Sequence, residues 1–426
     1  MKKSQLDVSK IRYSDLDTLR AQYTTTPGVR KLDQHCLCSH IPSEEQPFRV
    51  ARAQESDKLK VLISKSPRRD GFKLSCPAND WKSFPSGQAA EAHIVGGGSC
   101  LVEGIAGVGK TSFVRGCIER IARNSDKKIV ILSKTHLASS RVNGHTADAW
   151  CRKHILSGTP KCDIVWLEEI GQLDIGLWAQ LGKLAFMHKH IQVVCTGDRF
   201  QFPPIANAWR SCTVDDEALW RSDFLFDLVG GCRFELTECM RSDKALFEAY
   251  NCLIGREVDL PLVIADYRQR FPLKEEPTAH HLTISHDARI KLNRSENLRL
   301  RPPEARFIKV KGSATVRCAA QSFYIWPGMT LLGCVGRPRR GIKNSCLYTV
   351  KECEELITFV EIPGEFTEEE VKADLRLSNC QTYASCQGTE FNASLTLHEL
   401  GHPRFTSRHL YVGLSRARAA DMVCCA

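Results

Sequence analysis

The stretch 104-GIAGVGKTS-112 matches the pattern G-x-x-x-x-G-K-[ST] from Gly104 to Thr111. An apolar segment, 99-SCLV-102, precedes it, and apolar residues at helical spacing follow it in 113–121. A strand, a glycine-rich turn and a helix in this order predict a loop whose backbone N–H groups surround phosphate oxygens at the start of the helix. A chance match in a disordered or purely helical stretch would lack both flanking elements. The sequence therefore predicts a nucleotide-binding α/β fold.

Within this loop each residue type has a separate task. Lys110 is expected to reach the β- and γ-phosphates of a nucleotide, and the Thr111 hydroxyl is expected to ligate Mg²⁺. The glycines let the backbone approach the phosphates, and the helix that begins near Lys110 adds the positive end of its dipole. The loop residues expected to bind the nucleotide are Gly104, Gly107, Val108, Gly109, Lys110, Thr111 and Ser112.

Two further segments place polar residues directly after apolar strands. In 164-IVWLEEIGQL-173, Glu168 is expected to hold Mg²⁺, directly or through water, and Glu169 to act as the general base that orients the attacking water. A plain strand end that faces solvent would also place two acids there, but the preceding phosphate loop favours the catalytic interpretation. In 197-GDRFQFPPI-205, Gln201 is a candidate sensor of the γ-phosphate, against the alternative of an ordinary turn rich in Gly, Asp and Pro.

The bulk composition describes a folded protein without membrane or secretory signals. The 426 residues are 42% apolar and 25% charged, so the chain can form two or three domains with their own cores. Lys and Arg outnumber Asp and Glu by 59 to 49, a surplus that is compatible with a polyanionic partner but does not require one. No apolar run is long enough to cross a membrane, and the start of the chain lacks the apolar core of a signal peptide. The 20 cysteines, many inside apolar runs, therefore indicate reduced thiols in an intracellular protein of the nucleus or cytoplasm.

One cysteine cluster has a different composition. Four ligand-type side chains crowd together near the N-terminus, His35, Cys36, Cys38 and His40, and Cys76 lies further on. Zinc sites usually have C-x-x-C spacing and four ligands that meet at one point. The C-x-C spacing seen here favours an ordinary loop, with a zinc site as the alternative.

The order of the predicted elements divides the chain into three parts. Residues 1–74 are polar and mixed in charge and form an N-terminal extension of unknown role. Short apolar strands alternate with helices in 75–232, and this predicts a parallel sheet with helices on both faces. The alternation restarts in 233–426, where a β-rich stretch punctuated by Gly and Pro at about 305–378 predicts a small β-module inserted into a second α/β domain.

Taken in order, these segments resemble the motifs of superfamily 1 helicases, most closely the RecD-like and petite-integration-frequency type of the 5′-to-3′ subgroup. The phosphate loop, LEEIGQL and GDRFQFPPI match the family's nucleotide motifs, and 236-LTECMRSD-243 looks like its arginine motif. Further along, 382-TYASCQGTEF-391 resembles its Gln-Gly motif, and 411-YVGLSRAR-418 resembles its Tyr-Val-Ala-Leu-Ser-Arg motif. The matches keep the family's order over residues 83–420, which is most of the chain.

The resemblance implies an α/β fold with two tandem RecA-like P-loop lobes and a small β-rich, SH3-like insertion in the second lobe. It implies ATP and Mg²⁺ as cofactors, Gln88 as the residue that reads adenine, and Gly388 as a further nucleotide contact. It also implies that Arg241 and Arg416 are arginine fingers, which would stabilise charge on the γ-phosphoryl oxygens from across a cleft. The expected catalytic residues are then Lys110, Glu169, Gln201, Arg241 and Arg416, and the expected metal ligands are Thr111 and Glu168.

By the same resemblance, four residues are expected to contact a nucleic-acid strand: His145, Thr146, Thr382 and Gln387. The basic loop beside the β-module adds three more on position and charge: Arg337, Arg339 and Arg340. Charge runs are often only solvated faces, and that alternative stays open. The implied partners are single-stranded and forked DNA and replication or repair proteins, with no membrane, and a monomer suffices for translocation.

The implied activity is ATP-driven 5′-to-3′ translocation on single-stranded DNA, coupled to duplex unwinding. Two alternatives stay open. The helicases and nucleotide 5′-triphosphatases of positive-strand RNA viruses share most of these motifs, and a non-hydrolysing nucleic-acid-binding subunit would keep the same fold. The second alternative depends on Glu168, which stands where the family usually has Asp. Gly413 and His286 also replace the family's usual Ala and Asn.

Overall fold

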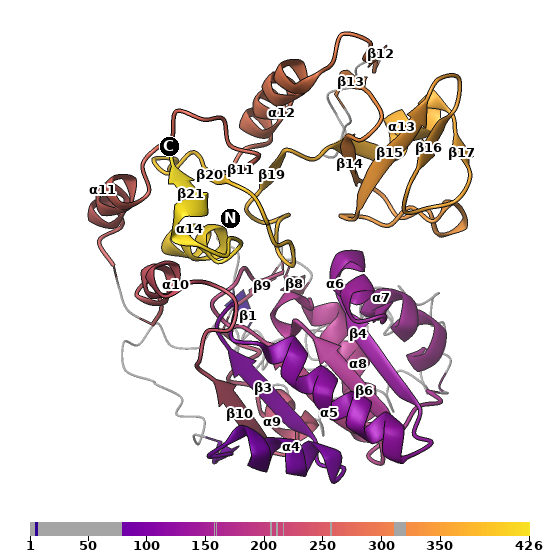
Figure 1. Cartoon of the computed structure of the whole chain (residues 1–426). Helices are drawn as coiled ribbons and strands as arrows, with labels where there is room; N and C mark the ends of the chain where they lie inside the picture. Colours follow the sequence, from indigo (N-terminus) through magenta and orange to yellow (C-terminus); the bar gives the residue numbers. More distant parts are fainter. Residues whose placement is uncertain are drawn as a thin grey trace, which may run out of the picture.

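The computed structural model describes residues 5–6 and 79–426, except 157, 159, 205–206, 210–211, 216, 256–257 and 311–320. The candidate zinc cluster at 35–40, with Cys76, lies outside these described residues. Two parallel sheets covered by helices and one small antiparallel sheet confirm the predicted fold class, two RecA-like lobes with a β-rich insertion (Figure 1). Across the described ranges, no helix has both the length and the apolar character that crossing a membrane would require.

A seven-stranded parallel sheet, in the order β2-β10-β3-β7-β6-β4-β5, forms the first lobe. Successive residues of its strand β6 point to opposite faces: Ile164 and Trp166 belong to one buried core, and Val165 and Leu167 belong to the other. Burial on both faces explains why this strand is an unbroken apolar run. Helices α4 and α5 pack on one face, and α8 and α9 pack on the other.

The strands of this sheet are β2 (Lys82–Ser83), β3 (Cys100–Gly104), β4 (Ile129–Ser133), β5 (His145–Thr146), β6 (Ile164–Glu168), β7 (Gln192–Gly197) and β10 (Cys232–Leu236). The helices of the lobe are α4 (Gly87–Val95), α5 (Lys110–Asn124), α6 (His136–Arg141), α7 (Ala147–Trp150), η3 (Cys151–Ile155), η4 (Ile170–Gln172), α8 (Ile175–Met187) and α9 (Asp223–Leu228). A separate three-stranded sheet joins β1 (Gln5–Leu6), β9 (Cys212–Val214) and β8 (Ala208–Trp209).

The first sheet extends further along the chain than predicted. Residue 233, which the sequence analysis places at the start of the second lobe, lies inside β10. This strand pairs in parallel with β3, with Phe234 opposite Val102, and also with β2. The first lobe therefore includes residues up to Leu236. Local periodicity identifies a strand here but does not say which sheet it joins, because its partners lie far earlier in the chain.

A four-stranded parallel sheet, in the order β19-β11-β20-β21, forms the second lobe. Its core includes Leu282 and Leu395 from the sheet, Tyr250 from α10 and Leu410 from α14. Ala106 of the phosphate loop belongs to this same core, although the loop is part of the first lobe. The two lobes therefore pack against each other at the phosphate loop itself.

The strands of the second lobe are β11 (His280–Thr283), β19 (Cys380–Thr382), β20 (Leu395–Leu397) and β21 (Val423–Cys425). Its helices are α10 (Lys244–Asn251), α11 (Leu260–Arg270), α12 (His286–Leu300), α14 (Ser407–Leu414) and η6 (Ala420–Met422).

An antiparallel module interrupts the second lobe within the predicted stretch 305–378. Five of its strands pair in the order β17-β16-β15-β14-β18, and β12 pairs with β13. The module has a core of its own, in which Phe323, Leu331 and Phe366 are buried. Its elements are β12 (Arg306–Ile308), β13 (Phe323–Ile325), β14 (Thr330–Gly333), η5 (Pro338–Arg340), β15 (Leu347–Cys353), β16 (Ile357–Phe359), β17 (Glu365–Phe366), α13 (Glu368–Asp374) and β18 (Leu375–Leu377).

Two asparagine side chains on α12 make the paired hydrogen bonds to strand backbone that a neighbouring strand would otherwise make. Asn293 Nδ2 donates to the Cys380 carbonyl at 2.9 Å, and Asn293 Oδ1 accepts from the Cys380 N–H at 2.8 Å, at the edge of β19. One turn later, Asn297 makes the same two bonds to Tyr324 of β13, at 2.8 and 2.7 Å. Both asparagines are buried. Because β13 belongs to the module and β19 to the lobe, α12 fixes one against the other.

Replacing Asn293 with leucine should destabilise the second lobe. The change leaves the N–H and C=O of Cys380 buried without these partners, which costs about 2–4 kcal/mol. We expect the midpoint of thermal unfolding, followed by circular dichroism, to fall by about 5 °C or more. Asn251→Ala, at an exposed position of α10, is the control and should leave the midpoint unchanged. An unchanged midpoint for Asn293→Leu would mean that another group satisfies Cys380.

Candidate active site

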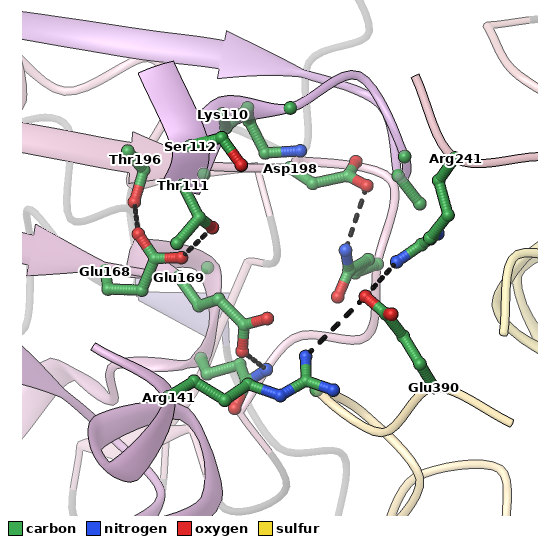
Figure 2. Close-up of a pocket in the computed structure, with 18 of the residues that line it drawn as sticks. Lys110, Thr111, Ser112, Arg141, Glu168, Glu169, Thr196, Asp198, Arg241 and Glu390 are labelled. Atoms are coloured by element: carbon green, nitrogen blue, oxygen red, sulfur yellow. Dashed lines mark hydrogen bonds and ion pairs between the residues drawn. The ribbon is translucent and has the colours of Figure 1, made fainter. Parts of the chain in front are cut away.

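A cavity lies between the two lobes, and residues from both of them line it (Figure 2). The first lobe contributes the phosphate loop, the end of β6 and the loop after β7. The second lobe contributes the loop after β19 and the end of α14, and the connection between the lobes contributes Met240 and Arg241. The predicted site residues that line the cavity are Gly107, Gly109, Lys110, Thr111, Ser112, Glu168, Glu169, Gln201, Arg241, Gly388 and Arg416.

Three residues predicted to bind the nucleotide do not line the cavity. A Cβ at Gly104, where φ is +150°, would collide with the Leu236 carbonyl oxygen, so this glycine is required by the close approach of β3 and β10. Val108 is buried next to Gly104. Gly104 and Val108 therefore support the phosphate loop on the side that faces away from the cavity. Gln88 is exposed on α4, and the structure does not bring it to the cavity wall.

Lys110 begins α5, and its amine is held over the phosphate loop. Nζ donates to the carbonyl oxygens of Gly104 at 2.7 Å and Ile105 at 2.8 Å. Gly107 and Gly109, at φ +84° and +83°, form the left-handed turns before it. Burial lowers the pKa of Lys110, and three nearby carboxylates oppose this effect. An ammonium beside such turns, at the start of a helix, is suited to binding phosphate.

Glu168 and Glu169 are adjacent at the end of β6 but have different surroundings. Glu168 is buried and accepts hydrogen bonds from the hydroxyls of Thr111 and Thr196. Glu169 has a left-handed φ of +54° and lines the cavity, where Gln172 Nε2 donates to it at 2.5 Å. Burial raises the pKa of Glu169, and the charge of Glu168 raises it further. The cavity thus holds one carboxylate bound by hydroxyls and a second with raised proton affinity.

A chain of hydrogen bonds connects Gln201 to the second lobe. Gln201 Nε2 donates to Asp198 Oδ2 at 3.0 Å. The same oxygen accepts from the Tyr411 hydroxyl at 2.5 Å, and the Tyr411 oxygen accepts from the Ala106 N–H at 2.7 Å. Tyr411 is buried on α14. The second lobe therefore contacts both the phosphate loop and the loop that carries Gln201.

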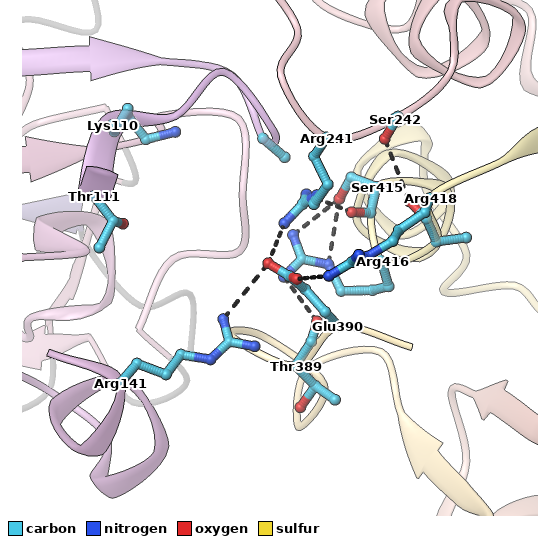
Figure 3. A network of polar contacts seen from close by, with 12 residues as sticks. Lys110, Thr111, Arg141, Arg241, Ser242, Thr389, Glu390, Ser415, Arg416 and Arg418 are labelled. Atoms are coloured by element: carbon cyan, nitrogen blue, oxygen red, sulfur yellow. Dashed lines mark hydrogen bonds and ion pairs between the residues drawn. The ribbon is translucent and has the colours of Figure 1, made fainter. Parts of the chain in front are cut away.

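Two arginines reach the cavity, Arg241 from the connection between the lobes and Arg416 from the second lobe (Figure 3). Arg241 Nη1 donates to Glu390 at 2.9 Å, and Nη2 donates to the Ser415 carbonyl at 2.6 Å. Arg416 is buried just after α14, where Nη2 donates to Ser415 Oγ at 2.9 Å and Nε donates to the Val412 carbonyl at 3.1 Å. Burial lowers the pKa of Arg416, and the charge of Arg241 lowers it further. Both guanidinium groups bond to Ser415. Two such groups at one cavity are suited to a multiply charged anion.

The nucleic-acid contacts implied by the resemblance lie outside the cavity lining. His145 is exposed and Thr146 is half-buried on β5, at the edge of the first sheet. Thr382 is buried and bonds a serine of its own turn at 3.0 Å. Gln387 Nε2 donates to the Phe202 carbonyl at 3.2 Å, which joins the two lobes. The first pair is accessible to a strand, whereas the second pair makes contacts within the protein.

The basic loop lies on the β-module, and ion pairs engage two of its arginines. Arg337 pairs with Asp374 at 3.1 Å, and Arg340 pairs with Glu370 at 3.0 Å. The Arg340 guanidinium also lies over an aromatic ring, 4.4 Å from its centre. Arg339 is exposed. Arg340 is half-buried in these contacts, whereas Arg337, although ion-paired, and Arg339 are both exposed.

Several cavity residues are not singled out in the sequence analysis: Arg141, Thr196, Asp198, Met240 and Glu390. A signal for Asp198 was present, because it is an acid directly after an apolar strand. For Arg141 and Glu390 no local signal exists, since their significance lies in a 3.9 Å approach between the two lobes.

Comparison with known proteins finds family models over both lobes. A model described as an AAA domain matches residues 85–211. A model described as the viral superfamily 1 RNA helicase core domain matches residues 248–425. None of the curated proteins compared with this chain matches it.

Solved structures of Pif1 helicases have the same fold. The Pif1 helicase from Candida albicans is 17% identical, with a TM-score of 0.59 over 80% of this chain and 93% of that one. Bacteroides Pif1 bound to single-stranded DNA is 19% identical, with a TM-score of 0.57 over 80% and 91%. A structure of two coordinating Pif1 helicases, concerned with DNA unwinding at forked duplexes, is 18% identical, with a TM-score of 0.59 over 80% and 91%. The likeness in fold, the two family models and the ordered motifs agree, and the chain therefore belongs to the superfamily 1 helicases, whose P-loop core is that of a nucleoside triphosphatase.

Proposed function

We propose that this protein is an ATP-driven motor that moves 5′-to-3′ along single-stranded DNA and separates the duplex ahead of it. The observation that carries the proposal is the origin of the cavity residues: Lys110 and Thr111 come from the first lobe, and Arg416 comes from the second. A nucleotide held at such a junction touches both lobes, so its binding and hydrolysis change how the lobes sit against each other. A phosphate site confined to one lobe would have no such consequence.

The residues present fit a nucleotide-bound Mg²⁺. The Thr111 hydroxyl and the Glu168 carboxylate meet in a hydrogen bond, and Mg²⁺ prefers hard oxygen donors of this kind, with other positions left to phosphate and water. The second oxygen of Glu168 is bound by Thr196, which restrains a side chain one methylene longer than the family's usual Asp. Mg²⁺ at these residues would neutralise charge on the β- and γ-phosphates.

The remaining cavity residues supply the groups that phosphoryl transfer to water requires. Glu169 is the proposed general base, and its raised pKa favours proton uptake from the attacking water. Gln201 is proposed to orient this water against the γ-phosphate. Arg241 and Arg416 are proposed to stabilise the charge that develops on the γ-phosphoryl oxygens.

Single-stranded and forked DNA are the proposed polynucleotide partners. Solved relatives with this fold carry single-stranded DNA or concern forked duplexes, and the chain has a net charge of +10, which favours a polyanion. The accessible candidates for contacts to the strand are His145, Thr146, Arg337 and Arg339. A motor on forked DNA would act beside replication or repair proteins, and a monomer would suffice for translocation.

A second candidate function is that of an RNA-acting helicase and nucleotide 5′-triphosphatase. The observation that favours it is the match of the viral RNA helicase core model to residues 248–425, which cover the second lobe with its module. Contacts to the phosphate backbone serve both nucleic acids, and a protein distinguishes RNA through the 2′-hydroxyl. The two functions therefore share the nucleotide site and differ in the polynucleotide.

Single-stranded DNA should stimulate ATP hydrolysis by the purified chain. Lys110→Ala should reduce hydrolysis by about 10²-fold or more in the presence of DNA, because the phosphate contact is lost. The measurement is phosphate release with DNA, with RNA of the same sequence, and without polynucleotide. Stronger stimulation by RNA would favour the second candidate, and hydrolysis that neither polynucleotide changes would exclude a motor. Nucleotide binding without any hydrolysis would indicate a binding subunit.

The rate of hydrolysis should depend on the ionisation of Glu169. A general base works only when deprotonated, so kcat should be full above the pKa of Glu169 and should fall as the pH drops through it. Since burial raises that pKa, we expect the acid limb of the kcat profile to lie above about 4.3, the ordinary value for glutamate. Glu169→Gln should lower kcat by about 10²-fold or more while nucleotide binding persists.

The matched control is Glu119→Gln, on the exposed face of α5, which should leave the whole profile unchanged. An acid limb that stays in place in Glu169→Gln would contradict the role of Glu169 as the base.

A further inference from the structure

The cavity contains an anion of the protein's own, at the point where three arginines converge (Figure 3). Glu390 Oε1 accepts from Arg241 Nη1 at 2.9 Å and lies 3.9 Å from Arg141 Nη1, and Glu390 Oε2 lies 3.6 Å from Arg418 Nη2. Arg141 ends α6 in the first lobe, Arg241 lies between the lobes, and Arg418 follows α14 in the second lobe. One carboxylate thus brings together guanidinium groups from three separate segments.

The backbone on both sides of Glu390 is anchored. The Thr389 carbonyl accepts from Arg416 Nη1 at 3.5 Å, and the Phe391 N–H donates to the Arg416 carbonyl at 3.0 Å. The Phe391 side chain is buried in the core of the second lobe. The Glu390 side chain therefore projects into the cavity from a fixed base.

The arginines keep Glu390 ionised, and Arg241 has donor capacity left. Burial acts to raise the pKa of Glu390, but the charge and the hydrogen bond of Arg241 outweigh it, so the pKa lies below its ordinary value. Arg241 Nε is buried and has no hydrogen-bond partner among the residues that the structure describes. Arg241 can therefore bind a second anion in the cavity in addition to, or in exchange for, this carboxylate.

Building on the proposed function, we propose that Glu390 is a positioning residue that holds Arg241 ready for the γ-phosphoryl group of a bound nucleoside triphosphate and competes with that group for it. Arginine binds carboxylate and phosphoryl oxygens through the same pairs of N–H donors. A phosphoryl group carries more charge than a carboxylate, so it replaces Glu390 as the ion-pair partner of Arg241. Glu390 then keeps its ion pairs with Arg141 and Arg418.

A nucleoside diphosphate has no γ-phosphoryl group and leaves the Arg241–Glu390 pair intact. Glu390 therefore affects the two nucleotides differently. Its negative charge weakens the binding of the triphosphate by repulsion and has little effect on the binding of the diphosphate. After hydrolysis and loss of phosphate, the carboxylate takes Arg241 back, which favours the diphosphate-bound arrangement of the two lobes.

The test is the affinity of Glu390→Gln for two nucleotides, measured by calorimetry with AMP-PNP and with ADP, each with Mg²⁺. The glutamine keeps the shape and removes the charge. We expect the Kd for AMP-PNP to fall by about fivefold or more and the Kd for ADP to change by less than about twofold. Steady-state kinetics should show KM and kcat for ATP falling together, because the triphosphate is bound more tightly and Arg241 is less well placed.

Two further variants make the result decisive. Glu390→Ala should shift the two affinities in the same directions, and it serves if the glutamine variant does not fold. Glu369→Gln, an ion-paired and largely exposed glutamate on α13, is the control and should bind both nucleotides as the natural chain does.

The possible outcomes separate this inference from the proposed function. If Glu390→Gln and Glu390→Ala weaken both nucleotides equally, Glu390 contacts a part of the nucleotide that both share, and the inference is wrong. Unchanged affinities for both nucleotides would overturn it as well. If the natural chain binds neither nucleotide, the proposed function fails, and the inference fails with it.

Discussion

The backbone N–H and C=O of Ala106 both bond to tyrosines of the second lobe, and the relation between the lobes depends on these contacts. The Tyr411 hydroxyl accepts from the Ala106 N–H at 2.7 Å, and the Tyr250 hydroxyl donates to the Ala106 carbonyl at 3.1 Å. The two tyrosine rings pack edge to face, with centroids 5.8 Å apart. Burial raises the pKa of Tyr411, so its hydroxyl keeps its proton and also donates to Asp198. The phosphate loop is therefore bonded directly to α14 through Tyr411.

The charges of the cavity are stable only as a set. Lys110 would be costly to bury alone, and the carboxylates at the ends of β6 and β7 compensate it. Arg416, which is almost fully buried, is compensated by the backbone and hydroxyl oxygens around it and by the charge of Glu169. Because these groups come from both lobes, separating the lobes would leave some of the charged groups exposed or without the opposite charges that compensate them. The residues of the nucleotide site are thus also part of the interface between the two lobes.

The sequence predicts best the features that depend on short contiguous stretches of residues. The phosphate loop, the apolar run of β6 and the acids after it occur as short contiguous patterns, so their elements and their place at the ends of the strands could be inferred. The position of β10 could not be inferred, because a strand's partners are chosen by packing over the whole lobe. The same holds for Asn293 and for the approach of Arg141 to Glu390, where two ordinary polar residues matter only through a distant contact. Gln88 is predicted from its position in a motif alone, and it is exposed and does not line the cavity.

The order of the cavity residues along the chain has a consequence during protein synthesis. All the strands of the first sheet have left the ribosome once β10 has emerged, while the second lobe is still being made. The Ala106 N–H gains its bond to Tyr411, and Asp198 gains its bond from the second lobe, only when Tyr411 emerges, and Arg416 follows. A nascent chain, or the product of a premature stop codon between β10 and Arg416, would thus carry a phosphate loop without the groups that complete it. The cavity between the lobes would be complete only when translation had passed Arg416.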